Sequence, residues 1–348
     1  MRLVRSGEER NGEARGMAAQ ETLLITQADV RKALDIAQAV AAVEDAFRAY
    51  GEGRAQMPAK PYLHFDKGDL RSMPGYLPDL GLAAVKNVNV HPQNAGLPTV
   101  MGTVTVFDPE TGFALAIMDG TYLTAMRTGA AGGVAARYLA RPDAAVASFI
   151  GAGRQAAAQL AALMTTMPAI VRVLACDLDA CRAEQFAQGA AETYGVEASA
   201  CALREAVRRA DVLTTVTPAR KPFVMRADVQ PGTHINAIGA DAPGKQELEV
   251  AVLTAARVVV DSWDQASHGG EINVAVRQGA ITRESIYGDI GEVVSGRKPG
   301  RKDDEQITVF DSTGLAIQDV ACAAHVYRRL TADPEAAAGL RRVDLLGG

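Results

Sequence analysis

The sequence predicts an α/β protein that combines a doubly wound parallel sheet with a second, α+β domain. The chain has 348 residues, which favours two domains over one. Between about residues 144 and 261, short apolar strand patterns alternate with longer helical patterns, an order typical of a parallel sheet covered by helices. From residue 61 to about 118, β-rich runs are separated by turn signals such as Asp108-Pro109 and Gly112, which predicts an antiparallel sheet.

The N-terminal region is expected to begin with a disordered extension over residues 1–16. This segment carries charges of both signs and lacks the apolar core of a secretory signal, and Met17 is a second plausible start of translation. Thr26 and Asp29 then form a helix-capping pattern. Apolar residues from 30 to 47 recur at helical spacing and predict two helices, the second of which ends at residues 51–53.

A helix of small residues, TAMRTGAAGGVAARYLA, follows the expected antiparallel sheet. Arg141-Pro142-Asp143 comes next and is a natural linker, because the residue before a proline rarely continues a helix. We therefore expect a new domain to begin near Ala144.

Beyond the linker, the expected elements alternate between strand and helix. The strands are AVASFI, VRVLACD, VEASA, DVLTTV, HINAIG and RVVVD. The first of the helices begins at Gln155. The others cover residues 180–193, the run LREAVRRA and residues 245–256. After Asp261 we expect a glycine-rich connection, followed by the strand ITVFDST and the helix GLAIQDVACAAHVYRRL.

The composition excludes several classes of protein. Hydrophobic residues make up 48% and charged residues 22%, with a formal net charge of -5, which is ordinary for a globular protein and argues against a nucleic-acid-binding surface. The apolar runs are shorter than the roughly 18 to 20 residues that cross a bilayer. The four cysteines are scattered and a chain of this size does not need disulfides, so we expect a soluble cytoplasmic protein.

A glycine-rich turn between strand and helix indicates a dinucleotide site. Gly151, Gly153 and Ala156 form a G-x-G-x-x-A pattern, the fingerprint of a Rossmann-type fold, and the following helix offers amide donors to a pyrophosphate. Asp177 ends the next strand, where its carboxylate can accept hydrogen bonds from ribose hydroxyls, which favours NAD over NADP. A solvated strand end is the structural alternative for Asp177, and Arg154 and Arg182 leave NADP as a second cofactor hypothesis.

Asp241 lies in a loop after the strand HINAIG, at the edge of the sheet where ligands of such folds bind. A carboxylate there can act as a general base. An aspartate before a turn and a helix is equally typical of a helix N-cap, so both interpretations stay open from the pattern alone.

Four cations of the first domain lie in unusually apolar surroundings. Lys86 and Arg127 occur inside AAVKNVNV and TAMRTGAAGG, with Lys60 and Arg71 in the nearby run PAKPYLHFDKGDLRSMP. A lysine in a strand is costly to bury unless it meets an anion, so the group predicts a site for a substrate carboxylate. A lysine on an edge strand is the structural alternative.

Other chemistries lack a motif in this chain. The five histidines and four cysteines have no metal-ligand spacing, so we predict no metal. A serine-hydrolase elbow and a P-loop lysine motif are both absent from the sequence. The run from His268 to Glu271 contains two glycines and is interpreted as a structural turn.

Together these blocks resemble the ornithine cyclodeaminase and μ-crystallin family from about residue 23 to 328. The matching blocks are AVKNVNVHPQN, GLPTVMG, AMRTGAAGG, IGAGRQA, INAIGADAPGKQEL and FDSTGLAIQD. Within the family, QMPAKPYLHFDKGDLRSMP, DPETGFALAIMDGTYLTAMRTGAAGG and QASHGGEINVAV are most similar to the archaeal-type alanine dehydrogenase branch. The cyclodeaminase branch has an arginine in place of Lys60 and a cysteine in place of Ala242, which disfavours that branch.

The resemblance implies a division of labour within the chain. Residues 17–140 with 312–340 would form a substrate-binding domain that also builds a homodimer, and residues 141–311 would form the dinucleotide-binding domain. Asp241 and Lys86 would be catalytic. The implied substrate-binding residues are Lys60, Arg71, Thr99, Arg127, Thr313 and Gly314, and the implied cofactor-binding residues are Gly151, Gly153, Arg154, Gln155, Asp177, Thr217, Asn236, Ala237, Ile238, Gly239, Lys245 and Ser312.

The implied reaction is the NAD-dependent oxidative deamination of a small L-amino acid, with L-alanine giving pyruvate and ammonia reversibly. NAD would accept a hydride from Cα, and Asp241 would activate the water that hydrolyses the resulting imine. The alternatives are an ornithine or diamino-acid cyclodeaminase that recycles NAD, and an imine or N-methylamino-acid reductase. A catalytically silent binding protein is disfavoured by the presence of Asp241, Lys86 and Arg127.

Overall fold

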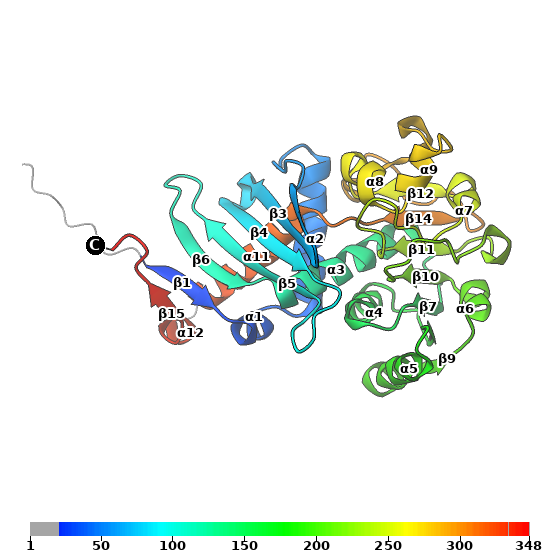
Figure 1. Ribbon diagram of the computed structural model, residues 1–348, viewed down its shortest axis with the longest axis horizontal. Coiled ribbons are helices and arrows are strands. Elements are labelled where there is room, and N and C mark those ends of the chain that lie inside the picture. The colour runs from blue at the N-terminus through cyan, green and yellow to red at the C-terminus, as the bar shows by residue number, and fades with distance from the viewer. Residues whose placement is uncertain (1–20, 333, 348) are drawn as a thin grey trace, which may run out of the picture.

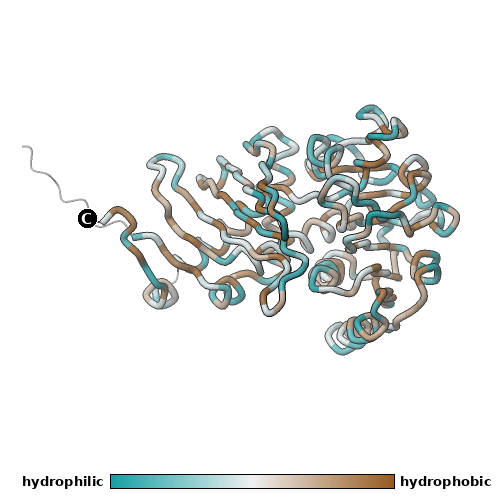
Figure 2. Tube along the Cα trace, viewed as in Figure 1, coloured by the Kyte–Doolittle hydropathy of each residue, from teal (hydrophilic) through white to brown (hydrophobic). Residues whose placement is uncertain are grey.

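The computed structural model describes residues 21–332 and 334–347, and it contains two sheets that lie side by side (Figure 1). The expected extension over residues 1–16 and the alternative start at Met17 lie outside the described residues. Figure 2 shows hydrophobic residues along the strands and hydrophilic residues in many of the outer helices and turns, as expected when both sheets are covered by amphipathic helices.

The first sheet is mainly antiparallel, as predicted from the β-rich runs. In spatial order its described strands are β15 (Arg341–Val343), β1 (Thr22–Ile25), β6 (Ala114–Asp119), β5 (Val100–Phe107), β4 (Leu82–Val90), β3 (Gly68–Leu77) and β2 (Tyr62–Phe65). The strands from β2 to β6 pair antiparallel in sequence order. The sequence did not predict β1, which pairs parallel to β6, or β15, which pairs antiparallel to β1 at the edge.

The helices of this half pack on the first sheet or on one another. They are α1 (Gln27–Ala33), α2 (Ile36–Gly51), α3 (Thr121–Leu139), α11 (Ala316–Ala332) and the short α12 (Pro334–Ala338). The predicted cap is confirmed, because Thr26 and Asp29 form a capping box at the start of α1. The apolar face of α2, with Val40, Val43 and Phe47 fully or nearly fully buried, packs against α3 and α11.

The second sheet is parallel throughout its described pairings, which confirms the doubly wound prediction. Its spatial order is β13 (Gly288–Asp289), β12 (Arg257–Val260), β14 (Thr308–Asp311), β11 (His234–Ala237), β10 (Val212–Thr215), β7 (Val146–Ile150), β8 (Arg172–Cys176) and β9 (Glu197–Ala200). Strand β14, orange in Figure 1, comes from late in the chain and lies between β11 and β12. The chain then returns to the first sheet as α11.

The helices of this half differ from the prediction in two places. They are α4 (Arg154–Thr166), α5 (Ala180–Tyr194), α6 (Leu203–Arg209), α7 (Val250–Ala255), α8 (Trp263–Gly269), α9 (Asn273–Arg277) and α10 (Ile290–Val294), with short 3₁₀ turns η1 (Pro78–Leu80), η2 (Arg226–Asp228) and η3 (Arg283–Ser285) in the chain as a whole. The helix expected over residues 245–256 is wrong in extent, because residues up to Glu249 form a loop held by buried carboxylates. The glycine-rich connection expected after Asp261 instead contains the short helices α8, α9 and α10, and Ile272, Ile281 and Ile290 are buried there.

Helices α3 and α4 join the two halves through a very close crossing. A Cβ atom added at Gly129 would lie 2.3 Å from the carbonyl oxygen of Ala158, and one at Gly133 would lie 2.8 Å from the Cβ of Ala162. The glycines of the small-residue helix therefore let the two backbones touch. Among the described residues, no helix is both long and apolar enough to cross a membrane.

Candidate active site

The predicted site residues gather where the carboxyl ends of the parallel strands face the first sheet. Gly151 follows β7, Asp177 follows β8, Thr217 follows β10 and Asp241 follows β11. The chain reverses its direction across the sheet between β7 and β10, and ligands of doubly wound folds bind at this point.

The glycine-rich turn has the geometry that a pyrophosphate requires. Gly151 has a φ of 98°, and a Cβ atom there would lie 3.0 Å from the carbonyl oxygen of Val216. Gly153 is the N-cap of α4, has no side chain to cap the helix, and has no heavy atom within 4 Å of the position of a Cβ. The first amides of α4 therefore face open space, so these residues fit a dinucleotide phosphate. Arg154 is exposed and Gln155 half-buried at the start of the helix.

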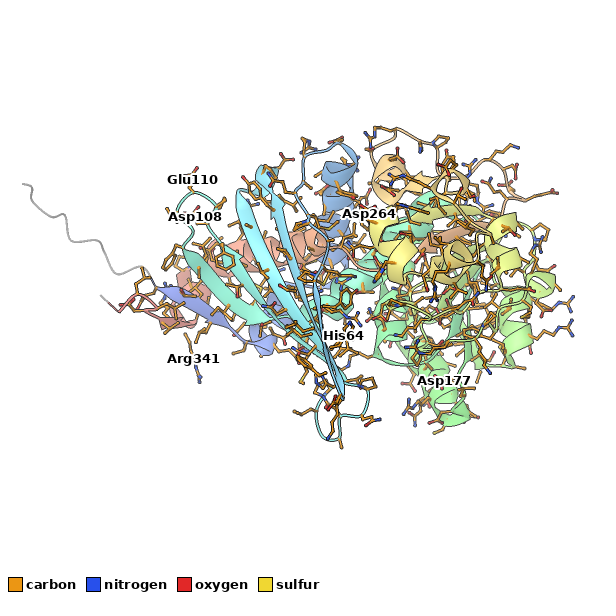
Figure 3. The ribbon with its side chains drawn as sticks, turned by 45° about the horizontal axis from the view of Figure 1, so that its top comes forward. His64, Asp108, Glu110, Asp177, Asp264 and Arg341 are labelled. Carbon is orange, nitrogen blue, oxygen red and sulfur yellow. The ribbon has the colours of Figure 1, made fainter. Side chains whose placement is uncertain are left out.

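Asp177 is positioned at the end of β8, beside this turn. Its Oδ2 accepts a hydrogen bond from the amide of Ala152 at 2.8 Å, and its Oδ1 accepts one from the amide of Asp179 at 2.9 Å. Figure 3 places Asp177 in the parallel-sheet half of the molecule, whereas Asp108 and Glu110 lie at a remote turn of the first sheet. Arg182, which kept the NADP hypothesis open, forms an ion pair with Asp179 at 3.2 Å.

A buried glutamate that sequence reasoning missed holds the neighbouring loops. Glu247 Oε1 accepts hydrogen bonds from the amide and hydroxyl of Thr217, both at 2.7 Å, and Oε2 accepts one from the amide of Gly239 at 3.0 Å. Burial raises the pKa of Glu247. The carboxylate thereby fixes two predicted cofactor-binding residues relative to each other.

Two further buried acids, Glu271 and Asp311, accept hydrogen bonds from backbone amides near Glu247. Glu271 Oε1 accepts hydrogen bonds from the amides of Glu247 and Leu248 at 2.8 and 2.6 Å. The turn expected from His268 to Glu271 begins later, because His268 and Gly269 are the last residues of α8. Burial and the neighbouring Glu247 raise the pKa of Glu271. Asp311 Oδ2 accepts from the amide of Ile272 at 3.0 Å, and burial raises the pKa of Asp311 to about 8.

Asp241 forms ion pairs instead of capping a helix. The next helix, α7, begins at Val250 with Glu249 as its N-cap, so the capping alternative for Asp241 is wrong. Asp241 Oδ2 accepts from Nη1 of Arg71 at 2.7 Å, and Oδ1 accepts from Nζ of Lys245. Burial raises the pKa of Asp241, but the charges of Arg71 and Lys245 outweigh it and bring that pKa below its usual range.

Lys86 and Arg127 meet at another buried carboxylate, that of Asp319. Strand β4 lies between β3 and β5, so the edge-strand alternative for Lys86 is wrong, and the lysine is fully buried. Oδ1 of Asp319 on α11 accepts from Nζ of Lys86 at 2.8 Å and from Nε of Arg127 at 3.1 Å. Burial and the neighbouring Arg127 lower the pKa of Lys86 to about 7.

Lys60 lies beside Lys86 and Arg127 and contacts the segment after β14. Lys60 Nζ donates to the carbonyl of Thr313 at 2.8 Å, and burial lowers the pKa of Lys60 to about 8. Asp261 fixes this segment, because its Oδ2 accepts from the amides of Thr313 and Gly314 at 2.6 and 2.7 Å. Gly314 has a φ of 81°, and a Cβ there would lie 2.4 Å from Nη1 of Arg127. The four predicted cations therefore belong to one cluster, defined as Lys60, Arg71, Lys86 and Arg127 and called the cation cluster.

Other predicted residues lie less directly at this site. Thr99 is exposed on the loop between β4 and β5, where its carbonyl accepts a hydrogen bond from the amide of His91 at 2.8 Å. Asn236 is buried in β11, where its Nδ2 donates to the carbonyl of Gly132 on α3 and its Oδ1 contacts His234. Ala237, Ile238 and Ser312 are buried at the ends of β11 and β14, and the amide of Ser312 donates to the carbonyl of Ala237 at 3.1 Å.

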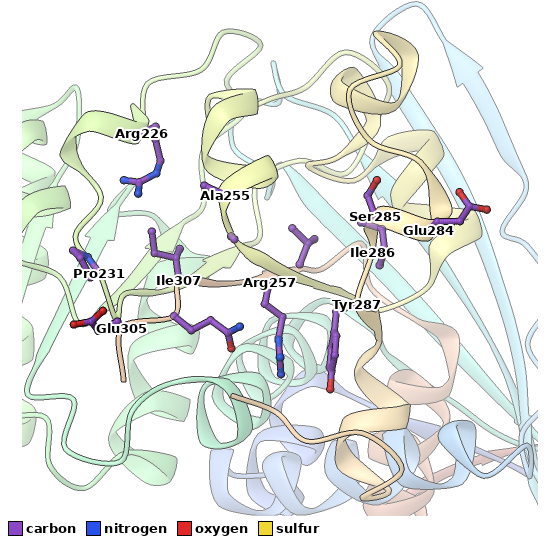
Figure 4. A pocket seen from close by; sticks show the side chains of 13 residues that line it. Arg226, Pro231, Ala255, Arg257, Glu284, Ser285, Ile286, Tyr287, Glu305 and Ile307 are labelled. Atoms are coloured by element: carbon purple, nitrogen blue, oxygen red, sulfur yellow. The ribbon is translucent and has the colours of Figure 1, made fainter. Parts of the chain in front are cut away.

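A separate pocket of about 690 Å³ lies at the opposite edge of the parallel sheet (Figure 4). Its lining includes Pro231, Arg257 and Ile307, which lie before or at the start of strands of the parallel sheet, whereas Gly151, Asp177 and Asp241 follow such strands. None of the predicted site residues lines this pocket.

Comparisons with known proteins agree with this geometry. The sequence matches the ornithine cyclodeaminase/mu-crystallin family over residues 20–333. It is 54% identical over 309 residues to an alanine dehydrogenase of Archaeoglobus fulgidus, and the alignment covers 88% of this chain and 94% of that protein.

Solved structures with the same fold point in the same direction. An archaeal alanine dehydrogenase, solved as a dimer with bound NAD, superposes with a TM-score of 0.89 at 52% identity and covers 93% of this chain and 99% of its own. A Δ1-pyrroline-2-carboxylate reductase of Thermococcus litoralis, solved with NADH and L-proline, has a TM-score of 0.88 at 35% identity and covers 92% of this chain and 100% of its own.

Proposed function

Because the chain belongs to the ornithine cyclodeaminase/mu-crystallin family, we propose that it deaminates a small L-amino acid oxidatively, converting L-alanine to pyruvate and ammonia reversibly. It is an NAD-dependent enzyme of the alanine dehydrogenase type. The proposal adds to this enzyme class the identity of the substrate and the direction of the net reaction.

One contact carries the proposal: Nη1 of Arg71 on β3 and Oδ2 of Asp241, in the loop after β11, lie 2.7 Å apart. An α-amino acid carries a carboxylate and an amine on the same carbon. Its carboxylate can replace Asp241 as a partner of Arg71, while Asp241 turns to the amine or to an adjacent water. A small amino acid can thus take the place of the direct ion pair between Arg71 and Asp241, which joins the first sheet to the loop after β11.

The cation cluster would orient the substrate. Lys86 and Arg127 hold the carboxylate, with Lys60 and Arg71 beside them, and burial strengthens each of these contacts. When bound, NAD supplies the acceptor for the hydride of Cα. Once Arg71 binds the substrate carboxylate, Asp241 loses part of the charge that lowers its pKa, so it can take a proton from the water that attacks the imine carbon. Loss of ammonia then leaves the 2-oxo acid.

The residues at the carboxyl ends of β7 and β8 would hold the cofactor. We assign the pyrophosphate to the turn from Gly151 to Gln155 and the ribose hydroxyls to Asp177, with the loops of Thr217 and Gly239 beside them. Lys245 is paired with Asp241, so its contact with the cofactor depends on release of that pair.

We further propose the assembly and the place of action. Residues 17–140 with 312–340 would bind substrate and form a homodimer, since the archaeal relative was solved as a dimer, and residues 141–311 would bind the dinucleotide. A cytoplasmic location suits an enzyme whose cofactor and substrate are intracellular metabolites.

The test is net formation of NADH with a panel of amino acids. Purified protein with NAD should accumulate reduced cofactor with L-alanine, because hydrolysis of the imine prevents the hydride from returning. Lys86→Met should abolish this signal, and the exposed Lys32→Met should retain it as a charge-matched control. Formation of proline from ornithine without net NADH, together with no reaction of alanine, would refute the proposal. Reduction of Δ1-pyrroline-2-carboxylate by NADH, again with inert alanine, would favour an imine reductase.

A further inference from the structure

We propose that Asp319 is a positioning residue for the reaction, because one oxygen of its buried carboxylate holds both Lys86 and Arg127. The inference rests on the proposed function for the roles of the two cations. Sequence reasoning assigned Asp319 no role, although it ends the block FDSTGLAIQD.

The geometry makes Asp319 the shared partner of the two cations. One oxygen, Oδ1, receives both Nζ of Lys86 and Nε of Arg127, at 2.8 and 3.1 Å. The three residues come from β4, α3 and α11, and each is buried. Because one atom links a strand to two helices, the relative position of the cations depends on this carboxylate.

The contact is poorly arranged for stability alone. The second oxygen, Oδ2, is buried and has no hydrogen-bond partner among the described residues. A buried carboxylate with an unsatisfied oxygen is costly, and a buried ion pair seldom adds net stability over apolar packing. The arrangement therefore points to a role in which the charge itself is needed.

The charges around Lys86 show in which direction Asp319 changes the pKa of the lysine. Arg127 on α3 and Lys60 before β2 both lower the pKa of Lys86, as does burial, whereas Asp319 on α11 raises it. Asp319 thus keeps the lysine protonated at a higher pH than its other neighbours allow. Without this carboxylate, the ammonium needed to bind a substrate carboxylate would be lost at lower pH.

A substitution of Gln318 can distinguish the two effects of Asp319, which are to hold Arg127 in place and to keep Lys86 protonated. Its Oε1 accepts from Nη1 of Arg127 at 3.0 Å, so it supports the guanidinium without contributing a charge. Gln318→Ala should weaken amino-acid binding through Arg127 and leave the titration of Lys86 in place. Asp319→Asn should change both.

The experiment measures the titration of Lys86 directly and through catalysis. In protein with ¹³C-labelled lysine, the Lys86 resonance is assigned by its loss in Lys86→Met and followed against pH by NMR. In Asp319→Asn we expect this resonance to titrate about 1–3 pH units lower, the effect of removing one opposite charge at contact distance. The corresponding limb of kcat/KM for the amino acid should move to lower pH by a similar amount.

Two further variants distinguish positioning from loss of structure. Cys322→Ala removes a buried side chain from the same helix without changing any charge, so it should lower the melting temperature and leave the Lys86 titration unchanged. Asp319→Glu keeps the charge and shifts its position, so the titration should stay near that of the unmodified protein while kcat/KM falls. It also provides a folded variant if Asp319→Asn does not fold.

The outcomes separate this inference from the proposed function. An unchanged Lys86 titration in Asp319→Asn would overturn the role of Asp319, whatever the enzyme does with alanine. Absence of NADH formation in the unmodified protein would refute the deamination, while a shifted NMR titration would still support the control of Lys86 by Asp319.

Discussion

Asp241→Asn is the substitution that isolates proton transfer from structure. The change keeps the shape of the side chain and removes its ability to take a proton. The capping alternative is excluded by the position of α7, so any large effect has to come from the ion pairs or from catalysis.

The structural cost should be small. Arg71 keeps its second carboxylate partner, because its Nε and Nη2 donate to the oxygens of Asp69 at 2.8 and 3.1 Å. The side chain of Asp241 is 29% exposed, so loss of its screened ion pairs should lower the free energy of unfolding by about 1 kcal/mol or less. This corresponds to a fall in melting temperature of about 2–4 °C for a domain of this size.

The catalytic cost should be much larger. Positioned proton transfer contributes about 10²-fold to 10⁴-fold to a rate, equivalent to about 3–5 kcal/mol of activation free energy. We therefore expect kcat for NADH formation to fall by this factor, while the affinity for NADH, measured by its fluorescence, stays within about twofold, in keeping with binding at the separate glycine turn.

Turnover, NADH affinity and melting temperature are measured on the same preparations. A folded variant with nearly unchanged kcat would remove Asp241 from the mechanism. Arg71→Lys is the comparison variant, since it keeps the charge opposite Asp241 but loses the bidentate contact with Asp69, and it should raise KM more than it lowers kcat.

Three other changes test separate parts of the structure. Gly314→Ala places a Cβ 2.4 Å from Arg127 at a φ of 81°, so KM for the amino acid should rise about tenfold or more while NADH affinity is retained; an unchanged KM would contradict this. The unmodified protein should prefer NAD, and Asp177→Asn should raise the NADP to NAD ratio of kcat/KM about 10-fold to 100-fold; equal use of both cofactors by the unmodified protein would show that Asp177 does not face the ribose. Burial raises the pKa of Asp311 to about 8, so the folded state holds a proton that the unfolded chain releases above about pH 4, and thermal stability should fall as pH rises from about 4 to 8. Asp311→Asn should reduce that fall in melting scans, and an identical pH dependence would refute the assignment.

The elements with strong local signals were predictable from the sequence. The alternating strands and helices of the parallel sheet, the glycine turn at Gly151 and the cap at Thr26 each depend on a few neighbouring residues. Strands β1 and β15 were missed because they lie outside the regular alternation of strands and helices, and each depends on a partner far along the chain.

The site was predictable only where burial leaves a mark in the sequence. Lys86 stood out because it interrupts an apolar strand, and the structure does bury it. Asp319 and Glu247 have partners that are separated from them by up to 233 and 30 residues respectively. Their roles follow from tertiary contacts that no local pattern encodes.

The close crossing of α3 and α4 has a consequence for how enzymes of this architecture can change. Arg127 lies two residues before Gly129 on α3, and Gly129 touches the backbone of Ala158 on the helix that Gly153 caps. The contacts from Arg127 to the glycine turn thus run along the main chain, and under the proposed function they would hold the substrate carboxylate and the cofactor phosphates at a fixed separation. Under the same proposal, a larger substrate side chain would be accommodated beyond Cα, by the loops around Lys60 and Thr313, so that substrate range could diverge there while the separation of the reacting centres stays the same.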